Sequence, residues 1–105
     1  LLREAGLPRG AITHGGGPVT GFEGDTLFEI VPPAPAEIRD VTGAGDALAG
    51  TTLARLARGA PFAEALRAGI AAATLTLESE GAAPAIERAA MEARLRLVPR
   101  PVAVP

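Results

Sequence analysis

A short glycine-rich stretch in the first half of the chain combines residue types suited to phosphate chemistry. The segment from Asp40 to Asp46 reads D-V-T-G-A-G-D, and a helical pattern of apolar residues begins directly after it. A glycine-rich turn that leads into a helix leaves several backbone N–H groups without intrahelical partners, backed by the positive end of the helix dipole. Such a helix start binds anions, most often phosphate. The sequence therefore predicts an anion site at Gly43, Ala44 and Gly45.

Asp46 follows these glycines at once, although a carboxylate beside an anion site repels the ligand unless it has a task of its own. That task would be to take a proton from a hydroxyl group that attacks the phosphate. The competing interpretation is an ordinary acid in the first turn of a helix, which the helix dipole favours. Two familiar phosphate motifs are excluded. A Walker loop requires a lysine, which this chain lacks, and a dinucleotide fingerprint requires Gly or Ala where Leu48 stands.

The segment from Asp40 to Asp46 resembles the C-terminal signature of the ribokinase-like (PfkB) family of sugar and nucleoside kinases, and the pattern continues without a gap to Pro84. The resemblance covers residues 11–97. It implies an α/β fold, the C-terminal part of a three-layer α/β/α domain. It also implies transfer of a phosphate from ATP to a hydroxyl of a sugar or nucleoside. The matching residues imply that Asp46 is the general base and that Gly43, Ala44 and Gly45 form the anion hole.

The same resemblance implies where the nucleotide binds. Thr13 and Gly15 match a strand end, usually T-x-G, that contacts ATP, and Gly45 and Asp46 adjoin its phosphates. Ile70 matches a position near the adenine that is often Asn or His in relatives, and an apolar residue there leaves only van der Waals contact. Mg²⁺ is the implied companion of ATP, but the family's N-x-x-E motif associated with Mg²⁺ is absent from these residues.

A monovalent cation, K⁺, is also implied beside the anion hole. The positions that match the family's cation loop, mostly through backbone oxygens, are Asp40, Thr42, Thr76, Ser79, Gly81 and Ala85. The alternative is that Asp40 is a turn residue and that Thr76 and Ser79 are helix-end hydroxyls. The stretch from Ala72 to Pro84 looks most like members of the pseudouridine-kinase type.

Short strands and about three helices must position these residues. Alternation and turn residues predict a strand from Gly10 to His14 and a hairpin of residues 18–22 and 26–31. A proline-rich connection, with Pro32, Pro33 and Pro35, then leads to the signature. Apolar spacing predicts helices from Ala47 to Gly59, from Phe62 to about Gly81, and from Ile86 to Leu97. We expect the proline-rich tail, residues 99–105, to be frayed.

Composition excludes several function classes. The 105 residues carry a net charge of −2, so a basic face for nucleic acid or an anionic membrane is not expected. The absence of cysteine excludes disulfides and thiolate metal sites. No apolar run approaches the roughly 18 residues of a membrane span. We therefore expect a cytoplasmic protein. The resemblance implies a small-molecule sugar or nucleoside substrate, and a homodimer is the expected assembly.

The chain opens like the end of a helix at a glycine cap, Leu1 to Gly6, with no helix start before it. We therefore expect residues 1–98 to be the C-terminal nucleotide-binding part of a kinase, without its N-terminal substrate and lid portion and inactive alone. Two alternatives stay open. One is a non-catalytic nucleotide-binding or regulatory module that keeps the phosphate cradle, and the other is an interaction domain whose glycines only form turns.

Overall fold

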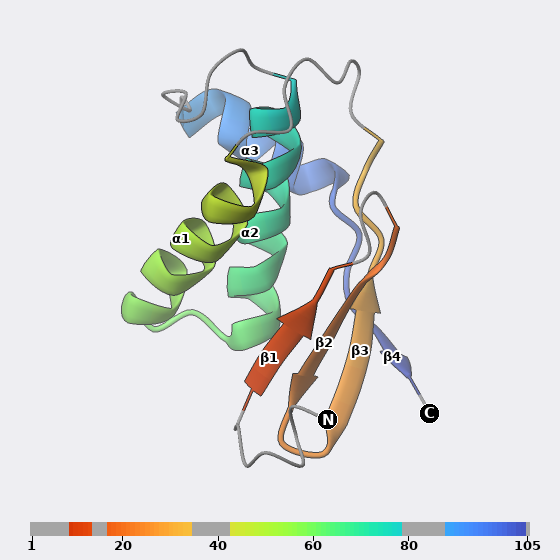
Figure 1. Cartoon of the computed structure of the whole chain (residues 1–105). Coiled ribbons are helices and arrows are strands. Elements are labelled where there is room, and N and C mark those ends of the chain that lie inside the picture. Colours follow the sequence, from red (N-terminus) through yellow and green to blue (C-terminus); the bar gives the residue numbers. More distant parts are fainter. Residues whose placement is uncertain (1–8, 14–16, 35–42, 79–87, 105) are drawn as a thin grey trace.

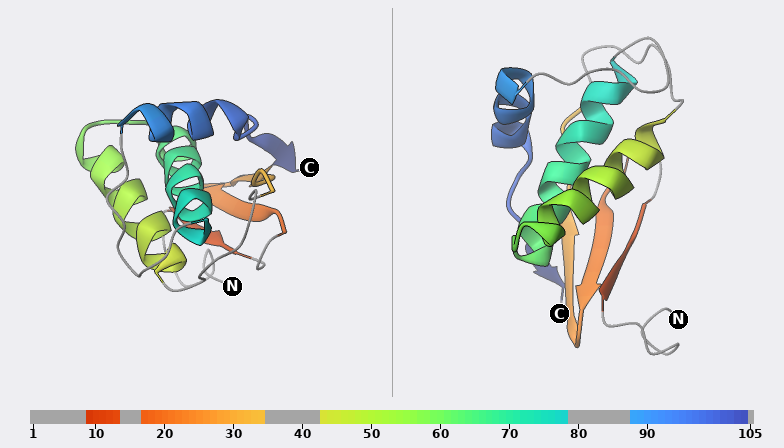
Figure 2. Two further views of the ribbon diagram at one scale, coloured as in Figure 1. Left: turned by 90° about the horizontal axis from the view of Figure 1, so that it is seen from above. Right: turned by 90° about the vertical axis from the view of Figure 1, so that its left-hand side faces the viewer.

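The computed structural model describes residues 9–13, 17–34, 43–78 and 88–104. Its antiparallel strands form one sheet in the order β1-β2-β3-β4, and the three helices gather on one side of it (Figures 1 and 2). The elements in chain order are β1 (Arg9–Ile12), β2 (Val19–Glu23), β3 (Thr26–Ile30), α1 (Ala44–Ala57), α2 (Phe62–Leu77), α3 (Arg88–Leu97) and β4 (Val102–Val104). The predicted mixture of short strands, a hairpin and about three helices is confirmed.

The hairpin of β2 and β3 supplies the face of the sheet on which the helices pack. Its two-residue turn contains Gly24 at φ 59, and the register pairs Val19 with Ile30 and Gly21 with Phe28. All four of these paired residues are buried. Side chains alternate between the faces of a strand, so this register directs one apolar row toward the helices.

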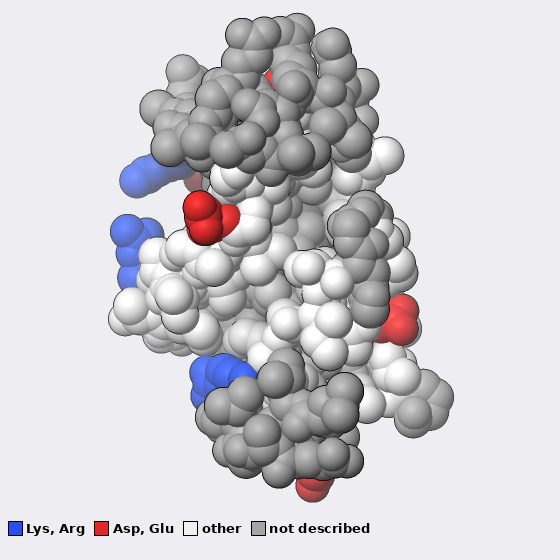
Figure 3. All heavy atoms as spheres, viewed as in Figure 1, with Lys and Arg blue, Asp and Glu red and all other residues white. Residues whose placement is uncertain are grey.

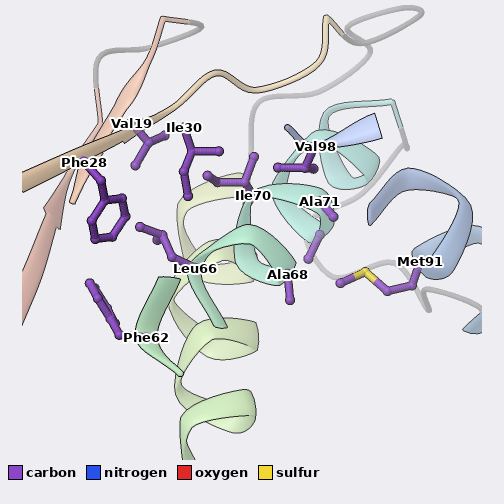
Figure 4. Packing of buried hydrophobic residues seen from close by; sticks show 11 residues of the cluster. Val19, Phe28, Ile30, Phe62, Leu66, Ala68, Ile70, Ala71, Met91 and Val98 are labelled. Atoms are coloured by element: carbon purple, nitrogen blue, oxygen red, sulfur yellow. The ribbon is translucent and has the colours of Figure 1, made fainter. Parts of the chain in front are cut away.

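Helix α2 lies between its two neighbours and contributes most of the buried residues (Figures 1 and 4). Pro61 is its N-cap, where the missing N–H costs nothing, and an alanine-rich sequence with high helix propensity follows. Leu66 and Ile70 are each 1% exposed and pack with the apolar row of the sheet. Phe62 meets Phe28 edge to face, with ring centroids 6.1 Å apart. Helix α2 therefore anchors the core.

Helix α1 is held against α2 by close backbone contact at Gly69. A Cβ atom at Gly69 would overlap the Thr52 hydroxyl and would lie 2.7 Å from the carbonyl oxygen of Leu48. Only glycine allows the two helices to approach this closely. Leu48 lies in the second turn of α1, so this contact also fixes where the predicted anion site at the start of α1 stands.

The C-terminal segment differs from the frayed tail that its prolines suggested. Strand β4 pairs with β3, with Val102 opposite Glu29 and Val104 opposite Leu27. The Arg67 guanidinium of α2 donates hydrogen bonds to the carbonyls of Leu95, Val98 and Pro99, and the bond to Val98 is 2.6 Å long. These bonds tie the end of α3 to α2 and lead the chain back to the sheet. The expectation of fraying is therefore wrong for residues 102–104.

Other boundaries shift by a few residues. Helix α1 begins three residues earlier than predicted, so Asp46 lies inside its first turn, and α2 ends at Leu77 rather than near Gly81. The predicted helix end at residues 1–6 and the connection beyond residue 34 lie outside the described residues. Among the described helices, none has the length and apolar character that crossing a membrane requires.

Candidate active site

The predicted anion site coincides with the start of α1. Gly43 is the N-cap residue, with φ 83 and ψ −4 in the left-handed region, which glycine adopts without steric cost. The first intrahelical hydrogen bond runs from the N–H of Ala47 to the carbonyl of Gly43 and is 2.8 Å long. The N–H groups of Ala44, Gly45 and Asp46 therefore precede the intrahelical ladder and have no acceptor within it. Within the described residues, no side chain caps this end.

The side of Gly45 on which a side chain would lie is open among the described residues. Gly45 is exposed, and a Cβ built on it would meet no atom within 4 Å. Packing within the described residues therefore does not require glycine at this position. Together with the positive end of the α1 dipole, the arrangement can accept an anion at the N–H groups.

Asp46 lies in the same first turn and is exposed. The predicted roles require free amides and a carboxylate beside a concavity. The geometry of the amides agrees with the first requirement. The second requirement stays a prediction: among the described residues, Asp46 does not line the hollow between the three helices or the smaller one beside Arg67 and Leu95.

One of the predicted nucleotide contacts at the end of β1 lies within the described residues. Thr13 directly follows β1 and is exposed, whereas Gly15 lies outside the described residues. Figures 1 and 2 show that β1 runs toward the end at which α1 begins and α2 stops. Strand β1 therefore leads the chain toward the end of the molecule where α1 begins, although about thirty residues separate Thr13 from Gly43 in the sequence.

Ile70, the predicted neighbour of the adenine, lies in the core. Its side chain is 1% exposed and lies near Ile30 and Val98 in Figure 4. This burial favours a packing role. Contact between Ile70 and a nucleotide stays a prediction.

The side-chain hydroxyl of Thr76, one of the predicted cation ligands, already forms a hydrogen bond within α2. Its side chain is 1% exposed, and its hydroxyl donates a 2.9 Å hydrogen bond to the carbonyl of Ala72. That leaves the carbonyl oxygen of Thr76, which lies at the negative end of the α2 dipole, whereas the N–H of Glu78 donates to the carbonyl of Leu75 at 3.2 Å. This geometry fits the expected use of backbone oxygens. The other predicted cation positions, Asp40, Thr42, Ser79, Gly81 and Ala85, lie outside the described residues.

An ion pair that the sequence did not reveal secures this end of α2. Arg94 of α3 donates from Nη2 to Glu78 Oε1 at 2.6 Å, and the two side chains are 13% and 20% exposed. The partners are 16 residues apart, so no local pattern marks them as a pair. Among the described residues, no cluster of three or more His, Cys, Asp or Glu side chains could hold a metal ion.

Comparison with known proteins finds carbohydrate and nucleoside kinases. The sequence model of the pfkB family carbohydrate kinases matches residues 2–89. The chain is 41% identical over 82 residues to the cytidine kinase of Thermococcus kodakarensis, which covers 77% of this chain and 30% of that protein. It is 42% identical over 60 residues to the pseudouridine kinase of Arabidopsis thaliana, which covers 56% of this chain and 16% of that protein.

A solved structure shows the same architecture. The carbohydrate kinase from Agrobacterium tumefaciens superposes with a TM-score of 0.74 at 42% identity, over 98% of this chain and 34% of that one. The chain spans between 11% and 30% of the length of the curated relatives it matches. The matched relatives act on different substrates by name, so the comparisons define a family and a fold rather than a substrate.

Proposed function

Because the chain belongs to the PfkB family of carbohydrate kinases, we propose that it forms the nucleotide-binding and catalytic part of such an enzyme. Membership of a kinase family implies ATP as the phosphate donor. The acceptor in this proposal is a hydroxymethyl group of a sugar or nucleoside. The observation that carries the proposal is the start of α1, where three N–H groups outside the intrahelical ladder adjoin an exposed carboxylate.

The backbone at Gly43, Ala44 and Gly45 would hold the migrating phosphoryl group. Phosphoryl transfer requires mainly positioning and charge stabilisation, and preformed N–H donors supply both without reorganisation. The left-handed conformation of Gly43 turns the chain into the helix, and the open space at Gly45 lets an anion approach the backbone. When bound, Mg²⁺ would neutralise part of the phosphate charge.

Asp46 would accept the proton of the attacking hydroxyl. A base must lie within hydrogen-bond reach of that hydroxyl, about 2.6–3.2 Å, in the productive complex. Asp46 is exposed, so a substrate has access to it, but the described residues do not enclose one there. The matched kinase structure is about three times longer than the part this chain covers, and we propose that residues of such a longer enzyme complete the acceptor pocket.

The remaining site residues complete the proposal. Thr13 and Gly15 would contact the nucleotide from the end of β1. The carbonyl of Thr76 would be one ligand of a K⁺ ion, with Asp40 and Thr42 on the segment before α1 and Ser79, Gly81 and Ala85 after α2. Two of the matched relatives are named for nucleosides, pseudouridine and cytidine, and the matched structure is named a carbohydrate kinase, so the acceptor in this proposal is a sugar or a nucleoside.

Replacement of the base tests the proposal. In the full-length enzyme, Asp46→Asn should lower kcat by about 10²- to 10⁴-fold, the range that general-base catalysis contributes, and should leave the Kd for ATP nearly unchanged. Asp25→Asn, in the exposed hairpin turn, is the control and should keep normal turnover. Phosphate transfer to pseudouridine, cytidine and ribose should be followed together with ATP binding.

The alternatives give different results in the same assay. A non-catalytic nucleotide-binding module would bind ATP but would show no turnover in the unsubstituted protein. An interaction domain would show no saturable ATP binding at all. Full activity of Asp46→Asn would exclude this carboxylate as the base.

A further inference from the structure

A hollow of about 560 Å³ lies between the three helices, apart from the start of α1. Ala72 of α2 and Met91 of α3, both buried, form its apolar floor. Its rim carries Arg55 and Arg58 from α1 and Arg88 from α3. We call this hollow the arginine groove. Its size falls within the range of about 300–1,000 Å³ that small-molecule sites occupy.

The charge of the arginine groove is unusual for this protein. The whole chain carries a net charge of −2, yet three arginines line this groove, and Glu92 is the one acid among the described residues that line it. Within the described part of the chain, none of the three arginines forms an ion pair. Figure 3 shows blue Lys and Arg atoms along the left-hand edge of the molecule, on the side where α1 lies in Figure 1.

Two neighbouring helices bring the arginines to the groove. Arg55 and Arg58 stand at the C-terminal end of α1, where the helix dipole favours cations. Arg88 is the first described residue of α3 and is exposed, so a ligand has access to its guanidinium. Like charges that line one hollow repel each other, and a bound anion would offset this repulsion.

The arginine groove is separate from the proposed phosphate-transfer site. Arg55 follows Asp46 by nine residues in α1, which corresponds to about 14 Å along the helix axis at 1.5 Å per residue. Asp46 does not line the groove. A ligand in the groove would contact the C-terminal half of α1, whereas ATP in the proposed site would contact its N-terminal end.

We propose that the arginine groove binds a phosphorylated small molecule, with the phosphate between the α1 arginines and Arg88 and the remainder over Ala72 and Met91. Guanidinium groups bind phosphate oxygens through paired, charge-assisted hydrogen bonds, and arginine suits this geometry better than lysine. The apolar floor gives the non-phosphate part of the ligand a surface to cover. This site goes beyond the proposed kinase activity and would exist whether or not Asp46 is catalytic.

The test uses inorganic pyrophosphate as the probe and isothermal titration calorimetry on the full-length protein. The unsubstituted protein should show two classes of pyrophosphate site, one at the start of α1 and one in the arginine groove. Arg58→Gln combined with Arg88→Gln should weaken the groove class by about tenfold or more, because charge-assisted hydrogen bonds are lost. Arg96→Gln combined with Arg100→Gln, which removes two exposed arginines outside this groove, should change neither class.

Gly45→Val separates this inference from the proposed function. It should abolish the class at the start of α1 and leave the groove class intact. If the unsubstituted protein shows a single class that Gly45→Val removes, or if the Arg58 and Arg88 double variant binds pyrophosphate normally, the arginine groove is not a phosphate site. If the protein shows no kinase turnover but has a groove class of pyrophosphate sites that the Arg58 and Arg88 double variant loses, the result would support the arginine groove as a phosphate site and contradict the proposed function.

A second titration with ADP identifies the kind of ligand. Binding to the groove that is tighter than for pyrophosphate indicates that the floor receives a base or sugar, and equal binding indicates that the phosphate is recognised alone. Arg58 and Arg88 are both exposed, so the double variant should melt within a few degrees of the unsubstituted protein.

Discussion

Two regions of the helical layer depend on glycine for different reasons. At Gly69, an added Cβ would overlap the Thr52 hydroxyl and would lie 2.7 Å from the Leu48 carbonyl, so helix packing requires glycine. At Gly45, an added Cβ would meet nothing within 4 Å. Glycine inside a helix costs about 0.5–1 kcal/mol relative to alanine, so a glycine that packing does not require suggests a function. Gly50 is equally open, and Gly45 differs from it by adjoining the amides at the start of α1.

Among the glycine substitutions, Gly45→Ala should have the largest effect, because the proposed anion hole requires backbone without a side chain. We expect kcat/KM for ATP to fall by about 100-fold, comparable to the loss of one anion-hole donor. The free energy of unfolding should rise by up to about 1 kcal/mol, because alanine favours the helix. Steady-state kinetics and urea unfolding of the full-length enzyme measure the two quantities.

Gly50→Ala is the matched control for this change. It should gain similar stability and keep normal phosphate transfer, because it lies in the middle of α1. If both alanine variants keep full activity, phosphate transfer does not require glycine at position 45.

Gly69→Ala should show the opposite pattern. Its Cβ would press on a backbone carbonyl that cannot rotate away, and overpacking of this kind costs about 1–3 kcal/mol. We expect a lower midpoint of urea unfolding and nearly normal kcat in the molecules that stay folded. Unchanged stability would show that α1 and α2 can move apart to admit the methyl group. Packing would then not require glycine at position 69.

Gly43→Ala should lie between these two variants. Its φ of 83 is in the left-handed region, where a side chain costs about 1–2 kcal/mol. We expect a stability loss of about 1 kcal/mol together with reduced phosphate transfer, because relief of the strain would turn the neighbouring amides. Thermal unfolding and initial rates on the same samples distinguish this from the single effects at Gly45 and Gly69. A stability loss with normal rates would remove Gly43 from the anion hole.

The sequence predicted the elements that depend on local patterns. The apolar spacing of α2 and the alternation of the hairpin strands gave both elements within a few residues, because buried periodicity is a property of consecutive residues. The start of α1 was placed three residues late, because apolar spacing does not register Gly43 as a cap. The glycines and Asp46 were predicted as site residues from their types and their position at a helix start, and their roles stay predictions.

Long-range contacts were not predictable in this way. Arg67 reaches carbonyls about 28–32 residues further along the chain, and this contact orders a segment whose prolines alone indicated fraying. Likewise, nothing in the sequence indicated that Arg88 of α3 would join two arginines of α1 around one hollow. Both depend on how α3 packs, which no local pattern records.

The smallest effect is expected at Thr52, the α1 residue whose hydroxyl lies beside Gly69 at the contact between α1 and α2. Thr52 is 7% exposed, and its hydroxyl has no hydrogen-bond partner among the described residues. A buried unsatisfied hydroxyl costs about 1–3 kcal/mol, so Thr52→Val should raise the free energy of unfolding, by about 0.5–1 kcal/mol after allowance for the tight fit against Gly69.

Thr74→Val is the matched control. The Thr74 hydroxyl donates a 2.9 Å bond to the carbonyl of Ala71, so its loss should lower stability slightly. Equal destabilisation by both variants would mean that the Thr52 hydroxyl contributes a bond at the helix contact.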